Sequence, residues 1–125
     1  MLKNIPKIIP PELLKILCEM GHGDEIVIAD GNFPSASMGK RVVYMSGNGA
    51  AEVLDAVLKL FPLDTYAKPL YLMEVVKGDN VETPIWDEYK DIVAKYSDAE
   101  FEHLERFAFY ERAKSAYAVI ATGES

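Results

Sequence analysis

Apolar residues are distributed along the chain in two patterns, and these patterns predict its helices and strands. Between residues 13 and 20 an apolar side chain returns every three or four positions, which predicts an amphipathic helix. Pro10 and Pro11 precede it, where a missing N–H costs nothing, and Gly21 is expected to end it as a left-handed cap. The stripe consists of Leu13, Leu14, Leu17 and Met20.

Short, nearly continuous apolar runs alternate with further helical stripes. The run at 25–29 is apolar at almost every position, so we expect a strand that is buried on both faces. Loops are expected at 34–39, where the sequence reads PSASMG, and at 77–80. Further strands are predicted at 41–45, 70–76, about 101–107 and 117–121, and further helices at 50–60, from Pro84 to about 96, and near 109–116.

Strands that alternate with helices are typical of an α/β fold. We expect a single compact domain over residues 1–125, with a mixed or mostly parallel sheet that is flanked by helices. A chain of 125 residues is long enough to bury a core without disulfides or a structural metal. No internal repeat, low-complexity tract or linker interrupts the pattern.

Charge and composition exclude several classes of partner. The formal net charge is -7 and the 13 basic residues are scattered, whereas nucleic-acid binding and docking on anionic membranes require clustered Lys and Arg. No apolar run approaches the roughly 20 residues of a membrane span, and prolines interrupt the first residues, unlike a secretory signal. Cys18 is the only cysteine, so we interpret it as a packing residue and expect a cytoplasmic location.

Three features are candidates for a functional site, and the first is the turn Gly47-Asn48-Gly49. It lies between a predicted strand and a predicted helix, where dinucleotide-binding loops occur. Glu52 stands where that fingerprint needs a third small residue, and its charge would repel a pyrophosphate at the helix N-terminus. We therefore interpret the segment as a plain turn. The chain also has no Walker-type loop, so no nucleotide cofactor is expected.

The second candidate is His22, which two glycines flank, so that a ligand can approach its backbone closely. Asp30 closes the following strand, at the edge of the sheet where ligands of α/β proteins bind. Three readings of His22 stay open: a solvated helix cap, a metal ligand together with Asp24, Asp30 and His103, and a general acid/base near neutral pH. The helix cap is the simplest of them, because the spacing matches no established metal motif. A glycosidase-type pair of Asp24 and Asp30 has no second feature in its favour.

The third candidate is the stretch 105–112, which reads ERFAFYER and contains Arg106. An arginine beside aromatic rings can hold a hydroxylated ligand, with the guanidinium on its oxygens and the rings against its C–H face. A core-facing aromatic stripe with solvated charges explains the same pattern. The residues alone favour this second reading.

Together, these segments resemble one known family. The stretches PPELLKILCEMGHGDEIVIADGNFPSASMG, LDTYAKPL and ERFAFYERAKSAYAVIATGE are similar in order and spacing to the fucose mutarotase and D-ribose pyranase family, on its fucose branch. The resemblance runs from near the N-terminus to Glu124. EMGHGDEI and RFAFYERA are its most specific segments.

The resemblance implies an isomerase without cofactor or metal, with an α/β fold and a ring-like homodecamer whose sugar pockets lie near subunit boundaries. It also implies that the chain interconverts the anomers of L-fucose or a similar monosaccharide. His22 matches the family's proton-donor histidine, and Asp30 and Arg106 match its sugar-binding positions. By the same resemblance, the ribose branch has a histidine at the position that Arg106 occupies here, so Arg106 favours fucose.

One departure from the family pattern leaves alternatives. Relatives continue past the TGE element into a segment with Tyr-Gly-Asn and a last strand, which also contacts sugar, whereas this sequence stops at Ser125. A D-ribose pyranase, which interconverts pyranose and furanose forms, and a non-catalytic sugar-binding subunit are the alternative functions. As an apolar wall for the sugar's methyl group the sequence offers Tyr66, Trp86 or the aromatic cluster Phe107, Phe109 and Tyr110.

Overall fold

β5 (Ala118–Thr122) is the middle strand of a three-stranded parallel sheet, and the backbone is organised around it. It pairs with β1 (Ile26–Ala29) on one side and with β2 (Val42–Met45) on the other. Val119 and Ile120 of β5 are both 0% exposed. A parallel strand that is paired on both edges and covered on both faces is where a continuous apolar run is expected.

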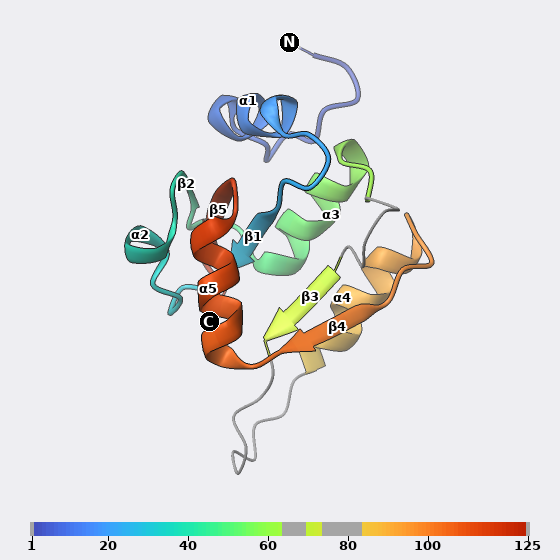
Figure 1. Ribbon diagram of the computed structural model, residues 1–125. Helices are drawn as coiled ribbons and strands as arrows, with labels where there is room; N and C mark the ends of the chain where they lie inside the picture. The colour runs from blue at the N-terminus through green and yellow to red at the C-terminus, as the bar shows by residue number, and fades with distance from the viewer. Residues whose placement is uncertain (1, 64–69, 74–83, 125) are drawn as a thin grey trace.

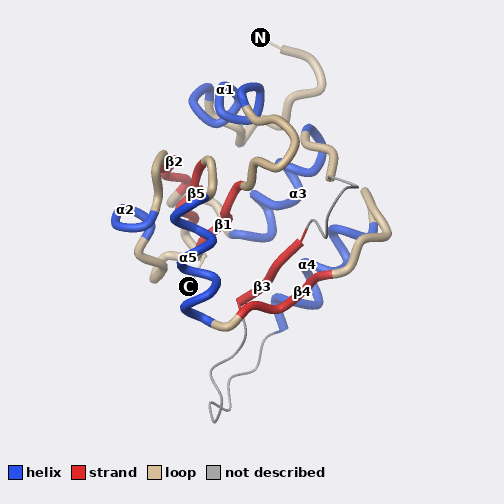
Figure 2. The backbone as a smooth tube through the Cα atoms, in the orientation of Figure 1, coloured by secondary structure: helices blue, strands red, loops and turns tan. Residues whose placement is uncertain are grey.

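A second sheet lies beside the first in the computed structural model, which describes residues 2–63, 70–73 and 84–124 (Figure 1). It consists of β3 (Leu70–Met73) and β4 (Phe101–Leu104), which are also parallel. In Figure 1 the arrows of β1 and β3 point the same way. Figure 2 shows the helices around the two sheets: α1 (Pro11–Glu19), α2 (Ser35–Met38), α3 (Ala50–Leu60), α4 (Pro84–Ala94) and α5 (Arg106–Ser115).

Two apolar clusters hold these elements together. The larger cluster joins α1 and α3 to the three-stranded sheet, and Leu13 of α1 and Val53 of α3 are 0% exposed within it. The smaller cluster joins α3 and α4 to β3 through Leu58, Leu70 and Val93. Because α3 contributes to both clusters, it connects the two sheets through side-chain packing.

The predicted α/β class is confirmed, with parallel strands flanked by helices. Each helix and strand that the sequence predicts is present within the described residues, although β4 ends at Leu104 and α5 already begins at Arg106. Among the described residues the sheet is divided in two, because β1 and β3 do not pair. The predicted strand residues 74–76 and the predicted turn at 77–80 lie outside the described residues.

The expected left-handed cap at Gly21 is wrong. α1 ends at Glu19, the next residue Met20 has an extended backbone, and among the glycines of the described ranges it is Gly23 that has a positive φ, of 86°. The chain therefore leaves the helix at once and makes its sharp turn two residues later. Glycine reaches that conformation without the steric cost that a Cβ would bring.

The expected loop at 34–39 and the expected burial of β1 also need correction. Residues 35–38 form the one-turn helix α2, closed by a bond from the Gly39 N–H to the Ser35 carbonyl of 2.8 Å. In β1 only Ala29 is buried, and Ile26 to Ile28 are half-buried. The run is apolar throughout, but β1 is the end strand of its sheet, so its outer side is less covered.

Two contacts tie the carboxyl end of β1 to the end of β5. The Thr122 hydroxyl, on a residue that is 3% exposed, donates to the Ala29 carbonyl at 2.7 Å. The Gly31 N–H donates to the Glu124 carbonyl at 2.6 Å. Asp30 stands between these two anchored positions, so its backbone is held on both sides.

The loop after β2 is anchored to the same end of β5. The Gly123 N–H donates to the Asn48 carbonyl at 2.8 Å. A side chain at position 123 would collide with the Ser46 carbonyl oxygen, so the close approach of these two backbone segments requires glycine.

We predict that Thr122→Val lowers the free energy of unfolding by about 1–3 kcal/mol, because the isosteric change removes a buried hydrogen bond and leaves its acceptor without that donor. Urea denaturation of the purified protein measures the difference. Thr122→Ser, which keeps the hydroxyl, is the control and should recover part of the loss. Equal stability of Thr122→Val and the parent chain would contradict the prediction.

Candidate functional site

Asp30 lies directly after β1, at the carboxyl edge of the three-stranded sheet, and is exposed. Its Oδ1 accepts hydrogen bonds from the Asn32 and Phe33 N–H groups, both at 2.9 Å. Such a turn fixes the orientation of the carboxylate. A carboxylate offers about four lone-pair sites, of which the turn uses two, so Asp30 keeps capacity to accept hydrogen bonds from a ligand.

Arg106 is the first residue of α5 and is exposed. Glu105 caps this helix: its two carboxylate oxygens accept from the N–H groups of Phe107 and Ala108, each at 3.0 Å. These two bonds lower the pKa of Glu105. The Arg106 guanidinium carbon lies 5.0 Å from the centre of the Phe107 ring. The cap thus explains why the helix begins at this point, with Arg106 at its N-terminus.

Aromatic contacts connect the Asp30 turn to α5. Phe33 meets Phe109 edge-to-face with ring centres 6.1 Å apart, and meets Tyr110 at 5.4 Å. Arg106 follows the carboxyl end of β4, and Asp30 follows the carboxyl end of β1. Asp30 and Arg106 therefore belong to the same side of the molecule.

Tyr89 of α4 is a residue of this side that the sequence did not single out. Its pKa is raised to about 12, mainly by burial and in addition by the charges of Glu124, Asp30 and Glu88. From the sequence, Tyr89 is only one member of the helical stripe of α4. Its proximity to the Asp30 charge depends on tertiary packing, for which the sequence carries no local signal.

His22 lies in the turn between α1 and β1 and is exposed. The Gly21 N–H donates to the Asp24 Oδ2 at 2.8 Å, and the Asp24 N–H donates to the Gly21 carbonyl at 3.1 Å. Together with the positive φ of Gly23, these bonds make a tight turn, and His22 lines a cavity of about 900 Å³ beside it.

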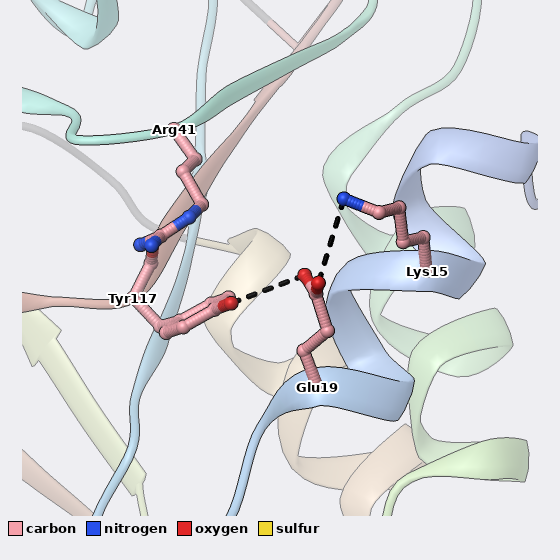
Figure 3. A network of polar contacts seen from close by, with 4 residues as sticks. All are labelled: Lys15, Glu19, Arg41 and Tyr117. Carbon is pink, nitrogen blue, oxygen red and sulfur yellow. Dashed lines mark hydrogen bonds and ion pairs between the residues drawn. The ribbon is translucent and has the colours of Figure 1, made fainter.

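A polar network holds the end of α1, from which the His22 turn departs (Figure 3). The Tyr117 hydroxyl donates to Glu19 at 3.1 Å, and Lys15 pairs with the same carboxylate at 3.4 Å. Arg41 stacks over the Tyr117 ring at 3.9 Å and donates to the Tyr117 carbonyl at 3.0 Å. This network therefore links α1 to the segments that lead into β2 and β5.

Within one chain the structure brings Asp30 and Arg106 to one side but places His22 elsewhere. His22 precedes β1 and Asp30 follows it, so the two residues stand at opposite ends of this strand. A strand of four residues spans about 13 Å. The sequence placed all three residues in one site, and the described chain by itself does not assemble that site.

The remaining candidates have simpler roles. In the turn after β2, the Asn48 side chain donates to Glu52 at 3.0 Å, so an acid occupies the start of α3. His103, on β4, packs against Trp86 with the two rings tilted by 45° and their centres 5.1 Å apart. Of the residues suggested as an apolar wall for the sugar, Tyr66 lies outside the described residues, and Phe107 is 62% exposed.

Residues 2–63, 70–73 and 84–124 contain no group of three or more His, Cys, Asp or Glu side chains that could hold a metal ion. Over the same part of the chain, no helix has the length and apolar character needed to cross a membrane.

The geometry defines a small α/β domain with polar side chains at the carboxyl ends of parallel strands, a common arrangement in proteins that bind small polar ligands. The sequence matches the RbsD / FucU transport protein family over residues 3–125. The chain belongs to this family, which confirms the resemblance identified from the sequence.

Individual relatives cover nearly the whole chain. The fucose mutarotase of Danio rerio is 48% identical over 131 residues, which include 99% of this chain and 86% of the relative. The crystal structure of FucU from Bifidobacterium longum is 60% identical, with a TM-score of 0.96 over 98% of this chain and 90% of that chain. The fucose mutarotase of Streptococcus pneumoniae, solved in complex with L-fucose, is 46% identical, with a TM-score of 0.92 over 99% and 90% of the two chains.

A ribose-bound relative is more distant. RbsD of Bacillus subtilis, solved in complex with D-ribose, is 25% identical, with a TM-score of 0.73 over 100% of this chain and 89% of that chain. Both sequence identity and structural likeness are therefore higher for the fucose proteins.

We predict that Asp30→Asn lowers the pKa of Tyr89 from about 12 towards 10, the ordinary value for tyrosine, because the carboxylate charge disfavours the phenolate. The shift stays incomplete, since burial is the larger cause. NMR titration of ¹³Cζ-labelled tyrosine measures it, and Tyr89→Phe identifies the signal. Glu52→Gln makes the same chemical change at a carboxylate that does not raise this pKa. If Tyr89 titrated identically in the parent chain, in Asp30→Asn and in Glu52→Gln, the prediction would be contradicted.

Proposed function

We propose that this protein is a cofactor-independent isomerase that interconverts the anomers of L-fucose. The observation that carries the proposal is the fold, which is shared over 99% of the chain with a fucose mutarotase solved with L-fucose. In this chain Asp30 and Arg106 follow the carboxyl ends of β1 and β4, which suits a role in binding the sugar. The curated relative of Danio rerio bears the same name at 48% identity. We also propose that residues 1–125 act as one domain and, because Cys18 is the only cysteine, that the protein works in the cytoplasm.

The reaction needs only proton transfers. A base removes the proton of the anomeric hydroxyl, an acid protonates the ring oxygen, and the C–O bond of the ring breaks to give the open aldehyde. Rotation about one bond and reclosure on the other face of the carbonyl produce the second anomer. Positioned acid/base groups contribute about 10²–10⁴-fold, or about 3–5 kcal/mol of barrier, which suffices for a reaction that already proceeds slowly in water.

In this proposal His22 moves the proton at the ring or anomeric oxygen. Its reference pKa near 6.5 suits both uptake and release of a proton near neutral pH. Asp30, whose turn leaves lone pairs available, accepts hydrogen bonds from the sugar hydroxyls. Arg106 donates to sugar oxygens through its planar fork. Phe107, which is exposed and lies beside that guanidinium, supports the role of apolar wall for the methyl group.

The separation of His22 from Asp30 supports a site that two subunits share. We propose a ring-like homodecamer in which His22 of one subunit faces Asp30 and Arg106 of the next. Both sets of residues are exposed in the single chain, as residues at a subunit boundary must be before assembly. In a closed ring each subunit contributes both halves, so every boundary is complete.

We predict that His22→Ala lowers the rate of fucose anomer exchange by about 10²–10⁴-fold, because it removes the proton-transfer group. Magnetisation-exchange NMR on L-fucose measures the rate with and without protein. The control is His103→Ala, which removes the chain's other histidine and should leave the rate unchanged. Full exchange activity of His22→Ala would refute the assignment.

The same experiment separates the alternatives. Faster pyranose–furanose exchange of D-ribose than anomer exchange of L-fucose would assign a ribose pyranase. Binding of fucose without faster exchange would assign a sugar-binding subunit.

We predict that two inactive variants restore each other's activity. When His22→Ala and Asp30→Asn are co-expressed in equal amounts, about one quarter of the shared sites in randomly mixed rings combine an intact His22 with an intact Asp30. About one quarter of the parent exchange rate should therefore return, while each variant alone stays inactive. A mixture of the two proteins assembled separately is the control. If each site were built within one chain, co-expression would restore nothing.

A further inference from the structure

The two residues that are proposed to bind the sugar hydroxyls come from different parts of the chain. Asp30 follows β1, whereas Arg106 is the first residue of α5. A ligand that contacts both side chains at once requires their relative position to be fixed, to within about 0.5 Å in a preorganised site. The fold must therefore couple the loop after β1 to the start of α5.

Phe33 contacts both of these segments. Its N–H donates to the Asp30 Oδ1 at 2.9 Å and is one of the two bonds that orient this carboxylate. Its ring packs edge-to-face against Phe109 and Tyr110 of α5, at interplanar angles of 84° and 78°. This geometry is favourable because the positive edge of one ring meets the negative face of the other. One residue thus joins the Asp30 carboxylate to the helix that begins with Arg106.

The backbone of Phe33 is itself held on both sides. Its N–H also donates to the Asp30 carbonyl at 3.4 Å, and its own carbonyl accepts from the Ser35 N–H at 2.8 Å. Ser35 is the first residue of α2 and is 5% exposed, so this second anchor lies in the interior. The half-buried Phe33 ring therefore extends from a fixed backbone, and its position on α5 is fixed with it.

The ring contacts continue along α5 to the guanidinium. Tyr110 packs edge-to-face against Phe107, one turn earlier in the helix, with ring centres 6.3 Å apart. The Arg106 guanidinium carbon lies 5.0 Å from the centre of the Phe107 ring. A continuous line of side chains thus runs from Phe33 to Arg106. Loss of the Phe33 ring would break this line at the end that lies next to Asp30.

We propose that Phe33 is a positioning residue, which fixes Arg106 relative to Asp30 so that both bind one sugar together. The inference rests on the proposed function, because it takes Asp30 and Arg106 as sugar-binding residues. Phe33 acts through them, so its loss affects the affinity for sugar. The proton-transfer step is spared, since His22 lies at the other end of β1.

The change Phe33→Leu tests this role in the whole 125-residue chain. Leucine keeps the N–H that orients Asp30 and most of the apolar volume, but it removes the ring. We expect L-fucose to bind about three- to tenfold more weakly, as the loss of edge-to-face contacts predicts. Titration calorimetry measures the affinity. The exchange rate at saturating fucose should stay within about twofold of the parent rate. Phe33→Tyr, which keeps the ring, should restore most of the affinity.

A double-mutant cycle separates positioning from packing. Arg106→Gln should weaken fucose binding by itself, because it removes the guanidinium that donates to the sugar oxygens. Adding Phe33→Leu to Arg106→Gln should then weaken binding by less than about twofold more, since no guanidinium is left to misplace. A residue that only stabilises the fold would weaken binding by the same factor in both backgrounds.

A second sugar separates positioning from direct contact with the ligand. D-arabinose has the same ring hydroxyls as L-fucose but lacks its methyl group. Phe33→Leu should weaken the binding of both sugars by the same factor, because Asp30 and Arg106 bind the hydroxyls. A loss confined to L-fucose would mean that Phe33 is itself part of the apolar wall.

Three results would overturn the inference: unchanged fucose affinity in Phe33→Leu, an equal loss with and without Arg106→Gln, or a loss confined to L-fucose. If Phe33→Leu does not fold, Phe33→Met replaces it, because the flexible methionine side chain fills irregular space. If Arg106→Gln bound fucose like the parent chain, the proposed sugar site itself would be wrong. That outcome distinguishes failure of the proposed function from failure of the role of Phe33.

Discussion

Pairing of β5 with both β1 and β2 is the constraint on which the rest of the structure depends. Every residue of the strand except Ala121 is buried, and the residues at its end hold the loops of both neighbours. Thr122 holds the end of β1, and Gly123, which follows the strand, holds the loop after β2. The loops after β1 and β2, on the side of the molecule that carries Asp30, are thus both anchored to the carboxyl end of β5. Loops placed on a rigid sheet in this way can carry function while the scaffold carries stability.

The sequence predicts the order of elements well because each has a local signal. The apolar stripe of α3 and the apolar run of β5 have different periods, and the structure shows them where those periods place them. Errors occur where the signal is short or ambiguous. PSASMG contains proline and glycine, yet Pro34 favours a helical start and one turn forms. The division of the sheet has no signature in the sequence, because β1 is as apolar as a central strand.

The candidate site is predictable residue by residue but not as an assembly. Asp30 was identified from its place at the end of a strand, and Arg106 and His22 gained weight only from the family pattern. Their relative positions come from strand direction, which a motif does not encode: a histidine before β1 and an aspartate after it must point to opposite edges. Tyr89 was overlooked because a half-buried tyrosine in a helical stripe is indistinguishable from a packing residue until α4 is docked.

The length of β1 has a consequence for regulation. If the groups that grip the sugar and the group that moves its proton sit at opposite ends of one strand, an isolated subunit can capture substrate yet cannot turn it over. Turnover then depends on how many subunits have met, so the specific activity of the protein rises with its own concentration and falls on dilution. A four-residue strand would in this way make the cellular amount of the enzyme a control on its efficiency as well as on its total output.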